Sequence, residues 1–308
     1  MREAALFALA GPTASGKTKL SMALAKKLNA EIISVDSTLV YQGLDVGSAK
    51  PMAEEMATIP HHLIDILPPW QPYSVNRFLS DVAQVIKAIQ TRRKPVLLVG
   101  GTMLYFKAFI EGISILPEAD PKLRQKIASE PLHLAYQRLR KIDPETAERL
   151  APNDKQRICR ALEVSEIAAM PFSKLIKTKK KTGGVGDRLK LAALFPSNRK
   201  HLHDAIAKRF YQMLESGFLK EVQRLYDHPE MRGDLPSMRS VGYRQAWQYL
   251  EGHDTKAQFI EKGIAATRQL AKRQLTWIRN WPHQVQLVDT ALDEAEKLRQ
   301  ILGYFQTP

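Results

Sequence analysis

Short apolar runs alternate with helical patterns over the first hundred residues. Strands are predicted at Ala4–Ala10 and Ile32–Val35, with a helix at about Lys17–Leu28 between them. A second helix is predicted from about Val75 to Thr91, and a strand at Val96–Val99 follows it. Apolar strands that alternate with helices are typical of a parallel sheet covered by helices on both faces. The pattern therefore predicts an α/β fold with a three-layer core.

The pattern changes near Gly112, after which one helical segment follows another. Prolines separate these segments, and strand signals are absent up to Lys190. Another central strand is then predicted at Leu191–Phe195. We therefore expect residues 1–112 and 190–308 to form one core with C-terminal helices, and residues 113–189 to form a helical insertion that acts as a lid or clamp. Within this insertion, the lysines of the run Lys174–Lys181 are expected to form a mobile basic loop.

The last third of the chain is predicted to be mostly helical. Helices are expected at about Lys200–Ser216, in a run that ends near Tyr226, and at about Lys256–Trp281. A strand at Val285–Val288 and a final helix from about Leu292 complete the predicted core.

The charge of the chain favours a polyanionic partner. The sequence holds 46 Lys and Arg against 32 Asp and Glu, a net charge of +14, most of which lies beyond Leu116. The single cysteine, Cys159, excludes a disulfide within the chain and a cysteine-based zinc site. No run approaches the roughly twenty apolar residues of a membrane span, and the start does not resemble a signal peptide. We therefore expect a soluble cytoplasmic protein without a membrane partner.

A phosphate-binding motif follows the first predicted strand. Its residues are Gly11, Pro12, Thr13, Ala14, Ser15, Gly16, Lys17 and Thr18, which match G-x-x-x-x-G-K-[ST] at the start of a helix. Backbone N–H groups and the helix N-terminus can hold a diphosphate or triphosphate there. Lys17 would reach the terminal phosphate oxygens and the Thr18 hydroxyl would bind Mg²⁺. The alternative, a glycine turn with an exposed lysine, explains fewer of the eight matched positions.

A strand-end carboxylate accompanies the motif, but not at the usual strand. Nucleotide hydrolases of this class usually carry an acid near Mg²⁺. Here Val96–Val99 leads into Gly100-Gly101-Thr102, whereas Ile32–Val35 leads into Asp36. Ligands of such sheets collect at the carboxyl ends of the strands, so Asp36 is a candidate catalytic residue. A turn or cap role for Asp36 is the alternative.

Eight segments occur together in an order that resembles one known family. They are GPTASGKT at 11–18, DSTLVYQGLDVGSAKP at 36–51, HHLID at 61–65, VGGTMLY at 99–105, LPEADPKLR at 116–124, NDKQRICRALEV at 153–164, RSVGYRQ at 239–245 and TRQLAKRQLTWIRN at 267–280. The chain resembles the bacterial tRNA dimethylallyltransferases, or tRNA isopentenyltransferases. Thr38-Leu39-Val40 departs from the more usual Met-Gln-Val type of sequence.

The resemblance implies a P-loop NTPase-like fold and a prenyl transfer reaction. The dimethylallyl group of dimethylallyl diphosphate would move to N6 of the adenosine at position 37 of tRNA, on the 3′ side of the anticodon, and diphosphate would leave. Asp36 would act as general base, Thr102 would lie near the adenine, and Lys17 and Thr18 with Mg²⁺ would hold the diphosphate. For Thr102, a helix N-cap explains the residue equally well. Arg209 and Arg224 either add cationic donors to the diphosphate or belong to solvated helix faces.

The partner implied by the resemblance is the anticodon stem-loop of tRNA, bound by a monomer. Its target base must leave the stacked loop before it can react. In the long predicted helix, Arg268, Lys272 and Arg279 fall on one stripe. The residues expected to contact tRNA are Asp36, Ser37, Thr38, Leu39, Thr102, Arg124, Gln156, Arg157, Ile158, Cys159, Arg160, Arg239, Ser240, Val241, Gly242, Tyr243, Arg244, Lys272, Arg273, Gln274, Leu275, Thr276, Trp277, Ile278 and Arg279.

Other functions stay open at this stage. A P-loop kinase of a small metabolite or nucleotide explains the α/β half, but not the basic remainder or the missing acid. An isopentenyltransferase of free adenine nucleotides does not need basic RNA-facing segments. A nonenzymatic RNA-binding module leaves the phosphate motif and Asp36 unexplained. His61 and His62 lack further ligands at metal-site spacing, which favours structural or surface roles.

Overall fold

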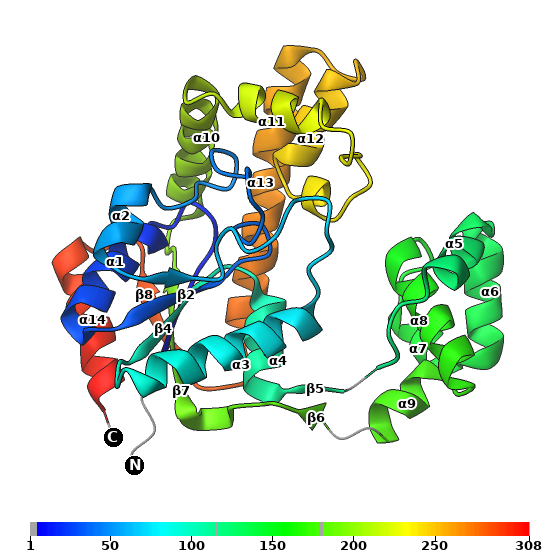
Figure 1. Ribbon diagram of the computed structural model, residues 1–308, viewed down its shortest axis with the longest axis horizontal. Coiled ribbons are helices and arrows are strands. Elements are labelled where there is room, and N and C mark those ends of the chain that lie inside the picture. The colour runs from blue at the N-terminus through cyan, green and yellow to red at the C-terminus, as the bar shows by residue number, and fades with distance from the viewer. Residues whose placement is uncertain (1–4, 115, 179–180, 308) are drawn as a thin grey trace. The chain divides into compact units, whose positions relative to one another are not determined.

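The computed structural model describes residues 5–114, 116–178 and 181–307, which form two compact units (Figure 1). Unit 1 comprises Met1–Ile110 and Val185–Pro308, and unit 2 comprises Glu111–Gly184. Ala4, at the start of the first predicted strand, lies outside the described residues, as do Lys179 and Lys180 of the basic run. In the part of the chain that is described, no helix combines the length and apolar character needed to cross a membrane.

A six-stranded parallel sheet forms the centre of unit 1, in the order β3-β2-β4-β1-β7-β8. The strands are β1 (Leu6–Ala10), β2 (Glu31–Val35), β3 (His61–His62), β4 (Val96–Gly100), β7 (Leu189–Phe195) and β8 (Gln286–Asp289). In the register of the ladders, Gly100 pairs with both Val35 and Ala10. The phosphate motif after β1, the Gly100-Gly101 turn and Asp36 after β2 therefore leave the sheet at one place.

Helices cover both faces of this sheet (Figure 1). On one face, α1 (Lys17–Leu28) and α14 (Glu294–Gln306) pack against Phe7 and Leu9. On the other, α3 (Val75–Thr91) and α4 (Met103–Glu111) pack against Leu6 and Ala8. The side chains of β1 thus alternate between two apolar layers, as expected for a central strand. The predicted three-layer core is confirmed.

A second apolar core lies among the C-terminal helices of unit 1. These are α10 (Arg199–Glu215), α11 (Phe218–Tyr226), α12 (Tyr243–Leu250) and α13 (Lys256–Arg279). The short helix η2 (Ser237–Arg239) adds Met238 to this core, whereas α2 (Ala53–Thr58) lies elsewhere in the unit. Helix α13 joins the two cores, because Phe259 packs in the helical cluster and Ile278 packs under the sheet. The loop after β2 also enters the helical cluster, through Val40, Tyr41 and Leu44.

Unit 2 is a helical unit with its own small core. Its helices are α5 (Pro121–Ser129), α6 (Leu132–Ile142), α7 (Pro144–Arg149), α8 (Lys155–Ala168) and α9 (Phe172–Thr178). The expected absence of strands there was wrong, because β5 (Ile113–Ser114) and β6 (Lys181–Thr182) form an antiparallel pair. Two-residue strands carry no periodic signal. The insertion was expected at 113–189, but residues 185–189 belong to unit 1, where η1 (Gly186–Arg188) leads directly into β7.

Candidate active site

The turn of the phosphate motif depends on the backbone conformation of Gly16. Gly16 has φ of 84°, in the left-handed region that glycine adopts without strain, and α1 begins at the next residue. Lys17 Nζ folds back and donates to the carbonyl of Pro12 at 2.6 Å. The loop therefore holds its lysine over its own backbone, beside the N-terminus of α1, where an anion is favoured.

The turn after β4 brings Thr102 to the loop that follows β2. Gly100 lies so close to the carbonyl of Val35 that a side chain there would overlap it, which explains the glycine. The Thr102 amide donates to Val35 O at 3.2 Å, and the Ser37 amide donates to Thr102 Oγ1 at 3.1 Å. Thr102 thus fixes the segment next to Asp36.

Asp36 is held by a short local hydrogen bond. Its Oδ1 accepts from the amide of Thr38 at 2.8 Å, the geometry of an Asx turn. The predicted turn role of Asp36 is therefore confirmed, because its carboxylate accepts from a backbone amide two residues later. Asp36 also lines a cavity that the motif residues line, so the turn places a carboxylate at that cavity.

This cavity, the central cavity, has a volume of about 1070 Å³ including its open mouth. Its polar lining includes Lys17, Thr18, Asp36, Thr38 and Arg209. Its apolar lining comes mainly from the C-terminal helices and includes Ile206, Phe210, Met213 and Leu270, together with Leu39 and Val241. A cavity with phosphate-binding groups, one carboxylate and an apolar wall suits an amphipathic ligand that carries a phosphate.

The electrostatics of the central cavity favour an anion. Burial and, to a smaller extent, the positive charge of Arg209 together lower the pKa of Lys17 to about 7, whereas Asp36 opposes the shift. Burial also lowers the pKa of Arg209, again opposed by Asp36. Two cations share one carboxylate in a poorly solvated space, so an added anion would relieve their repulsion. Of the two arginines left open by the sequence, Arg209 lines the cavity and Arg224 is exposed.

Gln274 of α13 joins the phosphate motif to the turn after β4. Its Oε1 accepts from the amide of Thr13 at 2.9 Å, and its Nε2 donates to the carbonyl of Gly101 at 2.9 Å. Gln274 is nearly buried, and a side chain at Gly101 would overlap its amide. The sequence assigned Gln274 to tRNA binding, but both ends of its amide are engaged within unit 1. Its place in the structure is that of a cross-link between two loops of the cavity.

The sequence of this chain is similar to that of one known protein family over most of its length. A sequence profile described as IPP transferase matches residues 39–281. The chain belongs to the IPP transferase family. The tRNA dimethylallyltransferase of Francisella philomiragia is 52% identical over 304 residues, which cover 97% of this chain and 98% of that relative. The family resemblance drawn from the sequence motifs is therefore confirmed.

Solved structures give the same fold for the IPP transferase family. The full-length tRNA isopentenylpyrophosphate transferase from Bacillus halodurans is similar with a TM-score of 0.72 and 36% identity, over 99% of this chain and 97% of that one. A eukaryotic dimethylallyltransferase acting on tRNA is similar with a TM-score of 0.77 and 26% identity, over 92% of this chain and 73% of that one. The P-loop NTPase-like fold class predicted from the sequence agrees with these neighbours.

The basic stripe predicted on α13 lines a groove in this IPP transferase. Arg268, Lys272 and Arg279 lie in it together with Arg199 and His203 of α10, and we call these five residues the basic groove. Nε of Arg268 is buried and, within the described residues, has no hydrogen-bond partner. Trp277 of the same helix is 38% exposed, with the ammonium of Lys107 5.7 Å from its ring centre.

The RSVGYR segment divides between surface, cavity and core. Arg239 and Arg244 are exposed, and Val241 and Gly242 line the central cavity. Tyr243 was expected to contact tRNA, but its ring is fully buried in the C-terminal helical core. This interpretation was wrong because Tyr243 begins α12 and its hydroxyl donates to buried Glu221.

Several other predicted tRNA contacts are also buried side chains. Ile158 and Cys159 pack in the core of unit 2, and Leu275 and Ile278 pack inside unit 1. Buried side chains cannot touch a ligand at the surface, so direct contact by Ile158, Cys159 and Ile278 is wrong for this structure. Leu275 lines the same groove as Lys272 and Arg279, and its contact with tRNA stays a prediction. Each of these helices has one apolar, buried face and one polar face. The prediction of tRNA contact covered every residue of the segment and therefore included the buried face.

In unit 2 the predicted tRNA contacts on α5 and α8 lie near one buried carboxylate. Glu163 is fully buried and accepts from Arg124 at 2.9 Å and from Arg160 at 2.7 Å. These arginines hold the pKa of Glu163 below its usual value although burial opposes this. Gln156 and Arg157 are exposed at the start of α8. The tRNA contacts at these four residues stay predictions.

The histidines of β3 have partners of their own. A ring nitrogen of His61 lies 2.7 Å from the carbonyl of Ile59, and one of His62 lies 2.7 Å from Glu31. Within the described ranges there is no group of three or more His, Cys, Asp or Glu side chains placed to hold a metal ion.

Proposed function

We propose that this IPP transferase moves the dimethylallyl group of dimethylallyl diphosphate to N6 of adenosine 37 of tRNA, on the 3′ side of the anticodon, and releases diphosphate. The observation that carries this proposal is that the phosphate loop and Asp36 line one cavity with an apolar wall. The relative named tRNA dimethylallyltransferase and the solved eukaryotic dimethylallyltransferase acting on tRNA support the choice of substrates.

The phosphate end of the site supplies the leaving-group chemistry. As the bond between C1 of the isoprenoid and the diphosphate oxygen breaks, negative charge grows on the phosphates. Lys17, Arg209 and the amides at the start of α1 stabilise that charge. The apolar lining from α10 and α13 holds the isoprenoid tail and keeps water from its allylic carbon.

The donor set fits Mg²⁺ that takes most of its ligands from a diphosphate and water. Thr18 follows Lys17 on the first turn of α1, and both Thr18 and Asp36 line the central cavity. Mg²⁺ often takes only one or two protein oxygens beside substrate phosphates, which matches this sparse set. Thr18 would hold the ion, and the ion would add positive charge beside the diphosphate.

The carboxylate of Asp36 supplies the base. The lone pair of adenine N6 is delocalised into the ring, so the amine is a poor nucleophile until its proton is removed. The N6–C1 bond forms as the C1–O bond breaks, and the N6 proton passes to Asp36. The Thr38 amide fixes the carboxylate, and Thr102 holds the adjacent Ser37, so both residues orient the base.

Recognition of tRNA is proposed for the basic groove and for exposed arginines near the cavity. A flipped adenine costs a few kcal/mol of lost stacking, which phosphate contacts elsewhere must offset. Arg239 and Arg244 flank the cavity-lining residues Val241 and Gly242, so they are placed to hold the loop from which the base comes. The residues proposed for this reaction all lie in unit 1 of one chain, so a single protomer is sufficient. We propose that it acts in the cytoplasm, where tRNA is modified.

Labelled dimethylallyl diphosphate tests the proposed function. It is supplied with an anticodon stem-loop, with AMP or ATP, and with no acceptor. We expect label on the stem-loop alone. Label on AMP but not on the stem-loop would contradict the tRNA assignment, and ATP turnover with a small acceptor would favour the kinase alternative.

Binding of tRNA is predicted to weaken steeply as salt rises. Each lost phosphate contact reduces the slope of log K against log salt by roughly 0.7–0.9. We therefore expect the double variant Lys272→Ala, Arg279→Ala to bind the stem-loop more weakly and with a slope shallower by about 1.5. Fluorescence anisotropy across a salt series measures both. Lys87→Ala on α3, an exposed lysine outside the basic groove, is the control, and an unchanged slope in the double variant would refute the groove assignment.

A further inference from the structure

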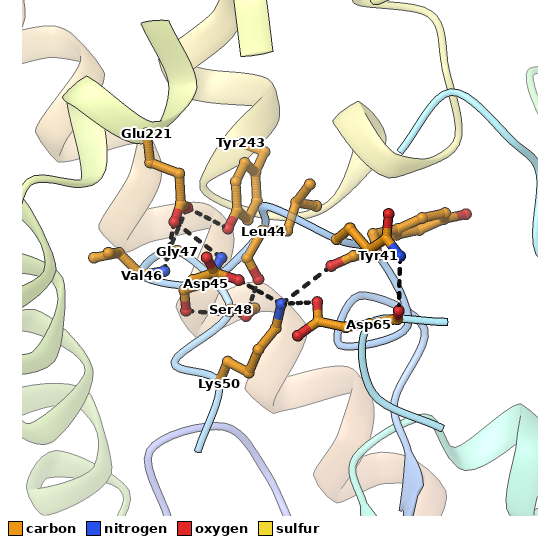
Figure 2. A network of polar contacts seen from close by, with 11 residues as sticks. Tyr41, Leu44, Asp45, Val46, Gly47, Ser48, Lys50, Asp65, Glu221 and Tyr243 are labelled. Carbon is orange, nitrogen blue, oxygen red and sulfur yellow. Dashed lines mark hydrogen bonds and ion pairs between the residues drawn. The ribbon is translucent and has the colours of Figure 1, made fainter. Parts of the chain in front are cut away.

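A buried carboxylate outside the central cavity binds the loop that forms one wall of it. Glu221 lies on the first turn of α11 and is 1% exposed. It accepts from the amides of Asp45 at 2.9 Å, Val46 at 2.7 Å and Gly47 at 3.1 Å, and from the hydroxyl of Tyr243 at 2.6 Å. Figure 2 shows the carboxylate pointing at the loop backbone, with the Tyr243 ring beside it.

These four hydrogen bonds fill the acceptor capacity of one carboxylate. Three of them come from successive backbone amides, an arrangement that forms an anion-binding nest. Burial and the neighbouring Glu221 raise the pKa of Tyr243 well above its usual value, so its hydroxyl stays a donor. A buried charge is costly unless it is fully hydrogen-bonded, and here it is fully engaged in holding one loop conformation.

The last residue of this nest and the two residues after it reach the site. Gly47, Ser48 and Ala49 line the central cavity, and Nη2 of Arg209 donates to the carbonyl of Ser48 at 3.4 Å. The far end of the loop is also fixed, because Lys50 forms ion pairs with Asp45 and Asp65 (Figure 2). The loop is therefore a rigid wall that offers a carbonyl to the guanidinium beside Lys17.

We propose that Glu221 is a positioning residue for the isoprenoid diphosphate, acting through residues 45–49 and Arg209. The inference rests on the proposed function. Glu221 does not line the cavity itself, so its effect on the reaction passes through the loop. Loss of the carboxylate leaves three backbone amides without this acceptor and frees the Ser48 carbonyl that orients Arg209.

Glu221→Gln and Gly47→Ala test this proposal from two sides. Glutamine keeps the shape of Glu221 but turns one acceptor oxygen into a donor. At Gly47 a methyl group would overlap the rings of Phe218 and Tyr243. This overlap would displace the loop of residues 45–49 while the Glu221 side chain stays unchanged. We expect each variant to raise KM for dimethylallyl diphosphate and the Kd of inorganic pyrophosphate by about tenfold or more, because each displaces the loop whose carbonyl orients Arg209. The Kd of the anticodon stem-loop is expected to stay unchanged.

Glu31→Gln is the matched control. Glu31 is another buried carboxylate of unit 1, bonded to Arg92 and His62 at the opposite end of β2 from Asp36. The Glu31→Gln variant is expected to have a lower melting temperature and an unchanged KM for dimethylallyl diphosphate. If Glu221→Gln does not fold, Gly47→Ala decides. Wild-type KM in the folded variants, or an equal loss of stem-loop affinity, would overturn the inference. Wild-type protein that transfers no prenyl group would instead overturn the proposed function.

Discussion

Lys17→Ala is expected to reduce kcat for prenyl transfer by about 10²- to 10³-fold, the loss typical of removing a preorganised donor from a developing negative charge. The lysine folds over the phosphate loop and shares the cavity with Arg209 and Asp36. Its ammonium therefore meets charge that grows only as the C1–O bond breaks. Single-turnover transfer of labelled prenyl group to the stem-loop measures the effect.

The neighbouring lysine on the same helix gives the control. Lys19 is 81% exposed and pairs with Glu294 at 2.5 Å, away from the cavity lining. Lys19→Ala is expected to retain wild-type kcat. Both variants should bind the stem-loop with wild-type affinity. Transfer at the wild-type rate by Lys17→Ala would contradict the proposed role of Lys17 in stabilising the leaving diphosphate.

Asp36→Asn is expected to reduce kcat by about 10²- to 10⁴-fold, because the N6 proton then has no positioned base. Asparagine keeps an oxygen that can accept from the Thr38 amide, so the turn is expected to survive. The stem-loop Kd should therefore change little. The measurement is single-turnover transfer at saturating dimethylallyl diphosphate.

Another strand-end carboxylate of the same sheet is the control for Asp36. Asp289 ends β8 and accepts from the amides of Ser197 and Ala291, without lining the central cavity. Asp289→Asn makes the same chemical change in a similar local setting and is expected to leave kcat at its wild-type value. Equal activity of Asp36→Asn and Asp289→Asn would exclude Asp36 as the base.

The parts of the site that were predictable from sequence are those fixed by local rules. The phosphate motif must follow a strand and start a helix, so its eight residues locate both elements and the loop between them. Asp36 was predictable because the carboxyl ends of parallel strands meet at one edge. The pairing of Gly100 with Val35 and Ala10 places these turns together at that edge.

The parts that could not be predicted depend on contacts between distant segments. Gln274 joins Thr13 to Gly101, and Glu221 binds the amides of residues 45–47, but neither spacing forms a sequence motif. For Arg209, a solvated helix face fitted the pattern as well as a cavity wall did. Tyr243 was assigned to tRNA contact together with Arg239 and Arg244, which are exposed, whereas its own side chain is fully buried. Tertiary packing decides such cases.

The central claim is that the isoprenoid diphosphate and the target adenine meet in the central cavity, between the phosphate loop and Asp36. A crystal structure of the protein with an anticodon stem-loop and a non-hydrolysable thio analogue of dimethylallyl diphosphate tests it most directly. We expect the diphosphate within hydrogen-bond distance of Lys17 and the amides at the start of α1. We also expect a flipped adenine with N6 about 3 Å from an Asp36 oxygen and roughly 3–3.5 Å from C1. A diphosphate bound elsewhere, or an adenine that stays stacked in its loop, would contradict it.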